Sequence, residues 1–158
     1  WNSVRLAHYP DQHGTQLRGE HSFEYALMPH RGDWQEGKVL EAAERFNVEP
    51  VVGVAGPGEG ELPLKHSFIE VEGDGLVLNA VKRGEWDETV VLRVSNPGTQ
   101  EVGGVLRLGF DVESAEVVNL MESVVEEELP SRGSGDFSLA VPAKKVVTVK
   151  LRLGDGAV

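Results

Sequence analysis

The densest group of side chains capable of chemistry lies between residues 25 and 34. Tyr25-Ala-Leu-Met-Pro-His30-Arg-Gly-Asp-Trp34 places a phenol, an imidazole, a guanidinium, a carboxylate and an indole within ten residues. An indole can stack on a sugar ring while Arg and Asp side chains hydrogen-bond its hydroxyl groups. The candidate substrate-binding residues are therefore Tyr25, His30, Arg31, Asp33 and Trp34. In the structural alternative, which we favour, Arg31 pairs with Asp33 and Trp34 fills one end of a β-sandwich.

The histidines suggest a metal site at first sight, because His8, His13, His21 and His30 fall within 23 residues. Metal ligands must converge, often from positions one helical turn apart, and neither HExxH nor HxH occurs here. On an unbroken strand the odd separation of His21 and His30 would place them on opposite faces. We therefore expect loop or surface histidines and no metal site in this chain.

Other catalytic signatures are also missing. The chain contains no cysteine, which excludes disulfides, thiolate nucleophiles and thiolate metal sites. No GxSxG motif occurs, and the glycine-rich stretch 56–60 lacks the Lys-Ser/Thr of a phosphate-binding loop. The acidic run 126–128 and the carboxylates before it lack the alternate spacing of a calcium loop. We expect no catalytic residue in this chain.

Charge and hydropathy restrict the partners. Fifteen Lys+Arg against 26 Asp+Glu give 158 residues a formal net charge of −11, which repels a phosphate backbone, so we expect no nucleic-acid partner. No apolar run approaches the ~20 residues of a membrane span, so we expect no membrane partner. The chain starts at Trp1, which suggests a fragment or a processed product. The absence of cysteine favours a bacterial cytoplasm.

The elements that must position the cluster are a strand and a short helix. Phe23, Tyr25 and Leu27 alternate with other residues and predict a strand over 20–29 with one buried face. A helical apolar face predicts a short helix near 35–47. Asp33, with Glu36 three residues later, resembles a capping box for that helix.

The rest of the chain has the pattern of an antiparallel β-sandwich. Strands are predicted over 64–71, 75–81, 89–94, 102–108, 114–121, 137–141 and 146–153. Asn96-Pro97-Gly98 predicts a hairpin between the third and fourth of them, with Gly98 able to adopt a positive φ. We expect an all-β chain with one short helix: a first part over 1–55, a Gly/Pro linker over 56–63, a terminal β-sandwich over 64–153 and a frayed tail over 154–158.

The stretch His21-Ser-Phe-Glu-Tyr25-Ala-Leu-Met-Pro-His30-Arg-Gly-Asp-Trp34, preceded by Tyr9-Pro10-Asp11, resembles the HxFxYALxPHxGDW segment of glycoside hydrolase family 38, the zinc-dependent α-mannosidases. Later stretches resemble the family in order: Glu44–Asn47, Ser67–Val71, Val77–Lys82, Val90–Val94, Asn119–Glu122 and Val146–Leu151. Met28 departs from the family pattern, which has an aromatic residue there, but it keeps an apolar side chain.

This resemblance implies the C-terminal β region of such an enzyme, namely the later part of a mutarotase-like supersandwich followed by a terminal β-sandwich. The family's zinc and its Asp nucleophile belong to an N-terminal catalytic domain, whose motifs are missing here. The resemblance thus implies a non-catalytic part of an α-mannosidase. This part would scaffold the catalytic domain and could border its substrate cleft. We also expect exposed edges that favour homo-oligomers.

Two other interpretations remain open. In the first, the chain is a free-standing carbohydrate-binding module that uses Tyr25 and Trp34. In the second, it is an interaction domain without sugar affinity. Substituting Trp34→Ala separates the first from the scaffold, because a module would lose glycan affinity whereas a scaffold would lose stability.

Overall fold

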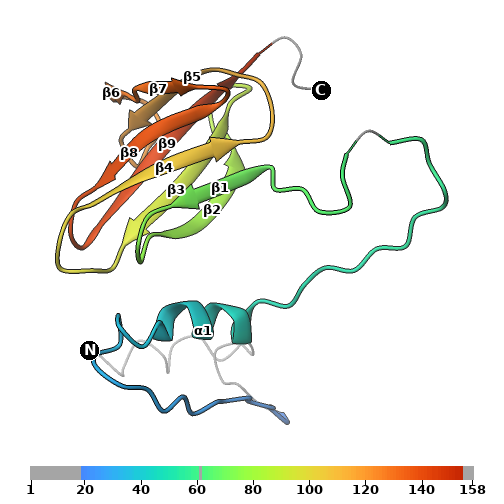
Figure 1. Ribbon diagram of the computed structural model, residues 1–158, viewed down its shortest axis with the longest axis vertical. Coiled ribbons are helices and arrows are strands. Elements are labelled where there is room, and N and C mark those ends of the chain that lie inside the picture. The colour runs from blue at the N-terminus through green and yellow to red at the C-terminus, as the bar shows by residue number, and fades with distance from the viewer. Residues whose placement is uncertain (1–18, 61, 155–158) are drawn as a thin grey trace, which may run out of the picture.

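The computed structural model describes residues 19–60 and 62–154, and within them one helix is followed by nine strands (Figure 1). The helix is α1 (Val39–Asn47). The strands are β1 (Ile69–Glu72), β2 (Val77–Arg83), β3 (Val90–Asn96), β4 (Val102–Leu108), β5 (Val112–Val118), β6 (Val125–Glu128), β7 (Ser131–Gly133), β8 (Asp136–Val141) and β9 (Lys145–Leu153).

The strands form two antiparallel sheets. One sheet has the order β1-β4-β8-β7, and the other has the order β2-β3-β9-β5-β6. Side chains from the facing sides of both sheets pack into one apolar core, as in β-sandwiches generally. Its buried members are Leu92, Val94, Leu106, Leu108, Ala115, Leu129, Phe137, Leu139, Val141, Val149 and Leu151. The predicted all-β sandwich with one short helix is confirmed.

The predicted hairpin between β3 and β4 is wrong. β3 pairs with β2 and β9, whereas β4 pairs with β1 and β8, so the connection between them crosses from one sheet to the other. Gly98 is also absent from the glycines with positive φ. A turn signal specifies a change of chain direction, but pairing depends on distant strands. We call residues 96–100 the inter-sheet arch.

The predicted strand over 20–29 is also wrong: these residues carry no strand and are exposed. Phe23, Tyr25 and Leu27 are 85%, 85% and 88% exposed. A strand is stable only when a neighbour accepts and donates its backbone hydrogen bonds and covers its apolar face. The described residues provide neither for this segment.

The predicted helix is confirmed, but it starts at Val39 instead of residue 35. Lys38 lies in the left-handed region with φ 51°, which separates the preceding turn from the helix. Leu40 and Phe46 on its apolar face remain 42% and 46% exposed, so the face is only partly covered.

Residues 48–60 and 62–68 contain no helix or strand, and they run outward from α1 and back to β1 (Figure 1). In place of the predicted strand over 64–71, the structure has the shorter strand β1. The sequence pattern does not predict the short strands β6 and β7. β4 has the predicted bounds, and β8 and β9 each begin one residue earlier than predicted. The domain boundaries drawn from the sequence stay a prediction.

Candidate functional site

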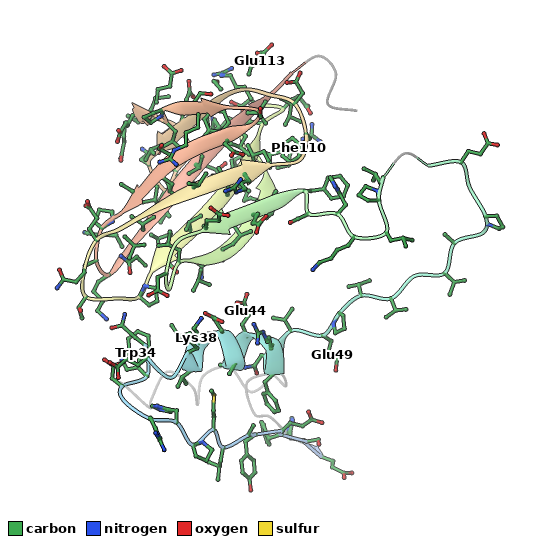
Figure 2. The ribbon with its side chains drawn as sticks, in the orientation of Figure 1. Trp34, Lys38, Glu44, Glu49, Phe110 and Glu113 are labelled. Atoms are coloured by element: carbon green, nitrogen blue, oxygen red, sulfur yellow. The ribbon has the colours of Figure 1, made fainter. Side chains whose placement is uncertain are left out.

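A groove lies between the turn before α1 and one end of the sandwich, and we call it the Trp34 groove. Its volume is about 370 Å³. One wall comes from residues 33–41, and the other comes from the β1–β2 connection at 74–77 and the inter-sheet arch. Figure 2 shows Trp34 between the start of α1 and this end of the sandwich.

The first wall is fixed by the Asp33 carboxylate. Its Oδ1 accepts hydrogen bonds from the backbone N–H groups of Gln35, at 2.8 Å, and Glu36, at 2.9 Å. The Glu36 carboxylate accepts in return from the Asp33 N–H at 3.3 Å. This reciprocal pattern is the capping box predicted from the sequence, but it closes the turn over 33–38 rather than the first turn of α1.

The second wall is fixed by the buried amide of Asn96, which is 1% exposed. Its Nδ2 donates to the carbonyl oxygens of Gln100, at 2.7 Å, and Val141, at 2.8 Å. Its Oδ1 accepts from the N–H of Gly98 at 2.8 Å. One side chain therefore pairs with three backbone groups, two in the arch and one at the end of β8. Gly98 is buried, and a Cβ added there would come within 2.8 Å of the Gln35 amide nitrogen.

Trp34 lies between the groove and a neighbouring hollow of about 430 Å³ that it shares with Lys144. The Lys144 ammonium is 5.4 Å from the centroid of the indole, within the range of a cation–π contact. Lys144 lines the hollow but not the groove. The indole is 38% exposed, so it remains open to a ligand.

Of the five residues predicted to bind substrate, only Asp33 and Trp34 line the groove. Tyr25 belongs to the exposed extended segment, and Arg31 is exposed. His30 is also exposed, and its Nδ1 is 3.3 Å from the Arg31 carbonyl oxygen. The proposed pairing of Arg31 with Asp33 is replaced by the capping contacts of Asp33.

Sequence reasoning missed the sandwich side of the groove, namely Asp74, Asn96, Gln100 and the adjacent Lys144. The Asn96-Pro97-Gly98 motif indicates only a turn, and no local signal marks these residues as ligand-binding, because only the connections that cross between the two sheets bring them to the turn of Trp34.

A second polar cluster covers the outer face of the larger sheet, and we call it the Glu122 cluster. Glu122 is 3% exposed and has a left-handed backbone with φ 62°. Its carboxylate accepts from Lys82 Nζ at 2.8 Å and from the Glu85 N–H at 2.9 Å, and Arg93 lies 3.5 Å away. Lys150 Nζ donates to the Glu122 carbonyl oxygen at 2.9 Å. The cluster therefore joins two connections to three strands.

The charges of this cluster stabilise one another. The hydrogen bond from Lys82 lowers the pKa of Glu122 below its ordinary value and outweighs the opposing effect of desolvation. The same bond raises the pKa of Lys82. Hydrogen bonds from Thr89 and Lys150 lower the pKa of Asp87. All three groups are charged at neutral pH, and they serve as contacts between loops and strands.

No group of three potential ligands among His, Asp and Glu converges within residues 19–60 and 62–154. His8 and His13 lie outside these ranges. His66 stacks edge-on against Phe68, with 4.6 Å between the ring centroids. No helix in the described part of the chain is long and apolar enough to cross a membrane.

Comparison with known proteins gives a consistent result. Alpha-mannosidase 2C1 of Mus musculus is 33% identical over 122 residues, or 75% of this chain and 11% of the mouse protein. The Homo sapiens protein of the same name is 32% identical over 122 residues, which are again 75% of this chain and 11% of that protein. A protein of Halalkalibacterium halodurans named "Putative mannosylglycerate hydrolase" is 27% identical over 137 residues, or 86% of this chain and 15% of that protein.

The chain thus matches only 11–15% of the length of these relatives. The family model that it matches is described as the glycosyl hydrolases family 38 C-terminal beta sandwich domain, and the match covers residues 75–151. These residues run from the β1–β2 connection into β9, so they contain most of both sheets. Residues 75–151 form a C-terminal β-sandwich domain of glycoside hydrolase family 38.

Proposed function

We propose that this chain is a non-catalytic C-terminal part of an α-mannosidase that hydrolyses terminal α-mannosidic bonds. In this role the sandwich scaffolds a catalytic domain of the same polypeptide, and the residues before it complete a second β-structure. Support comes from the family match of residues 75–151 and from relatives whose names denote action on mannosides.

The observation that carries the proposal is the uncovered apolar surface before the sandwich. Phe23, Tyr25 and Leu27 alternate along an extended segment and are at least 85% exposed. Val51 and Val54 are 99% and 100% exposed. Side chains of this kind gain free energy only when another surface removes them from water, at roughly 25 cal/mol per Å² of apolar area. A larger domain packed against residues 20–28 and 51–54 would provide that surface.

The resemblance to family 38 assigns a zinc ion to the catalytic domain of the proposed enzyme. The described residues do not fit such an ion, because no three ligands among them converge. We therefore place the metal, the nucleophile and the general acid outside residues 19–60 and 62–154. No step of the hydrolysis is assigned to this chain.

The test is hydrolysis of an aryl α-mannoside by this purified chain with added zinc, measured beside the full-length polypeptide. We expect release of the aryl group by the full-length polypeptide only. Turnover by this chain alone would contradict the scaffold role, and His8, His13, His21 and His30 would then be the candidate metal ligands. An inactive full-length polypeptide would contradict the proposed α-mannosidase.

A further inference from the structure

We propose that the Trp34 groove is a binding site for a neutral hexopyranoside. The Glu122 cluster is not a comparable site, because its charged groups satisfy one another, and the exposed apolar segment belongs to the proposed scaffold role. The choice of α-mannosides as the first probe rests on the proposed function, whereas the site itself rests on the geometry below.

The size of the groove suits one or two sugar rings. Pockets for small molecules occupy roughly 300–1,000 Å³, and the Trp34 groove, at about 370 Å³, lies at the lower end of this range. Its lining combines an aromatic platform, Trp34, with the aliphatic side chains of Leu40, Leu76 and Val102. An indole beside aliphatic groups can cover the C–H face of a pyranose ring, which is apolar.

The polar groups of the groove match the hydroxyl edge of the same ring. Asp33 uses only its Oδ1 for the turn, so its Oδ2 can accept a hydroxyl hydrogen. Asp74 and Gln100 are exposed on the opposite wall. A hydroxyl group both donates and accepts, so it can pair with carboxylates and with a side-chain amide.

The charge of the groove argues for a neutral ligand. Four carboxylates line it, from Asp33, Glu36, Glu41 and Asp74, against one ammonium, from Lys38. That ammonium is 3.7 Å from the Glu41 carboxylate, which offsets part of its charge. A phosphate or carboxylate ligand would enter a field of its own sign. Sugars without an acidic group avoid this repulsion.

Both walls are fixed before any ligand arrives. The Asp33 capping contacts set the turn that carries Trp34, and the three Asn96 contacts set the arch that carries Gln100. A site whose walls are already ordered loses less conformational entropy on binding. A small neutral ligand in such a site is expected to bind with a Kd on the order of 1 mM.

The experiment is an NMR titration of this chain with methyl α-D-mannopyranoside and with an α-linked mannobiose. We expect saturable shifts at the Trp34 indole N–H and at Gln100. Trp34→Ala should weaken binding more than about tenfold, since an aromatic platform that the ligand covers carries much of a site's affinity. The matched control is Trp86→Ala, because Trp86 is 68% exposed and lies at the other polar cluster; this variant should bind like the parent chain.

Asp74→Ala provides a second test, because Asp74 is exposed in the β1–β2 connection and its loss should leave the fold intact. We expect a loss of affinity of about fivefold to tenfold, as for one charge-assisted hydrogen bond. Mannose 6-phosphate should bind more weakly than the neutral sugars, and more strongly in Asp74→Ala than in the parent chain.

Three outcomes would overturn the proposal: no saturable shift at ~50 mM sugar, which is far above the expected Kd; an equal loss in Trp34→Ala and Trp86→Ala; or tighter binding of the phosphate. Each of these leaves the α-mannosidase assignment untouched, because that assignment is tested by hydrolysis in the full-length polypeptide. Conversely, turnover by this chain alone would contradict the scaffold role without affecting the titration.

Discussion

Glu122 shows how a single buried carboxylate can organise a surface of the sandwich. Its left-handed backbone is costly for a residue with a side chain, by about 1–3 kcal/mol. The contacts with Lys82, Arg93 and the Glu85 N–H offset this cost and hold the β5–β6 connection over the outer face of the sheet. Val91 and Thr148 on that face are consequently almost fully buried.

The substitution Glu122→Gln tests this role, because it keeps the shape and removes the charge. We expect the free energy of unfolding to fall by about 2–3 kcal/mol, since Lys82 would keep only the exposed Glu85 carboxylate and Arg93 would lose the charge of the Glu122 carboxylate in a desolvated site. Chemical denaturation, monitored by circular dichroism, measures this change in the free energy of unfolding. Glu113→Gln is the control, because Glu113 is exposed near the β4–β5 connection (Figure 2) and should change stability by less than about 0.5 kcal/mol. Equal effects in both variants would contradict the role of the cluster.

The pH dependence of stability follows from the same groups. The pKa of Glu122 and that of Asp87 are lowered in the folded chain, so their contribution is present above the ordinary carboxyl pKa and is lost as pH falls through the folded values. The pKa of Lys82 is raised, so its contribution persists from acidic to neutral pH and is lost only at strongly alkaline pH. Thermal unfolding between pH 7 and pH 3 should show a marked decrease in Tm below the ordinary Glu value of 4.5. That decrease in Tm should be smaller in Glu122→Gln than in the parent chain. Identical pH profiles for the two chains would contradict the contribution of Glu122 to the pH dependence.

At the scale of elements, the inter-sheet arch decides the topology. β3 and β4 follow one another in the chain but lie in different sheets, and Asn96 links their connection to Val141 at the end of β8. The side chain thus joins the end of β3 in one sheet to the end of β8 in the other. Backbone groups at such a crossing lack ladder partners, so a side chain must supply the hydrogen bonds.

The substitution Asn96→Ala should therefore reduce the free energy of unfolding by about 2–4 kcal/mol, because three backbone groups lose their partner and two of them, at Gly98 and Val141, are buried. The substitution should also weaken the binding of any ligand in the Trp34 groove, because it loosens the arch. The control is Asn79→Ala, since Asn79 is exposed at the irregular pairing of β2 with β3. Urea denaturation measures both variants, and a loss below about 1 kcal/mol in Asn96→Ala would contradict the role of the arch.

The same elements show which parts of the fold could be predicted from the sequence. β4, β8 and β9 follow from local alternation of apolar residues, because each has one face in the core. The alternation over 20–29 is equally clear but forms no strand, since a local pattern cannot show whether a neighbour exists. Trp34 and Asp33 stood out by residue type. Their partners across the groove, Asp74 and Gln100, come from connections more than 35 residues away in the chain and required the fold.

At the scale of the whole molecule, the core formed by the described residues lies within residues 69–153. α1 has no buried residue, and the alternating residues before it are exposed. A shortened chain beginning at Leu62 should therefore keep its cooperative unfolding, with Tm lowered by only a few degrees, which corresponds to roughly 1 kcal/mol or less. Differential scanning calorimetry of both chains tests this. Loss of the cooperative transition would show that the sandwich depends on the preceding residues.

The exposed segment also predicts how the isolated chain associates. Phe23, Tyr25 and Leu27 offer an apolar strand face and unpaired backbone groups, and such segments pair with other chains. The net charge of −11 opposes association but is spread along the whole chain, and salt screens it. We therefore expect a dimer or a larger assembly by light scattering at micromolar concentration in 0.15 M salt.

Replacing the three residues by serine should yield a monomer with the Tm of the parent chain, because the core does not include them. A monomeric parent chain at micromolar concentration would show that this apolar segment stays exposed to water without associating. That result would weaken the inference that another domain covers it.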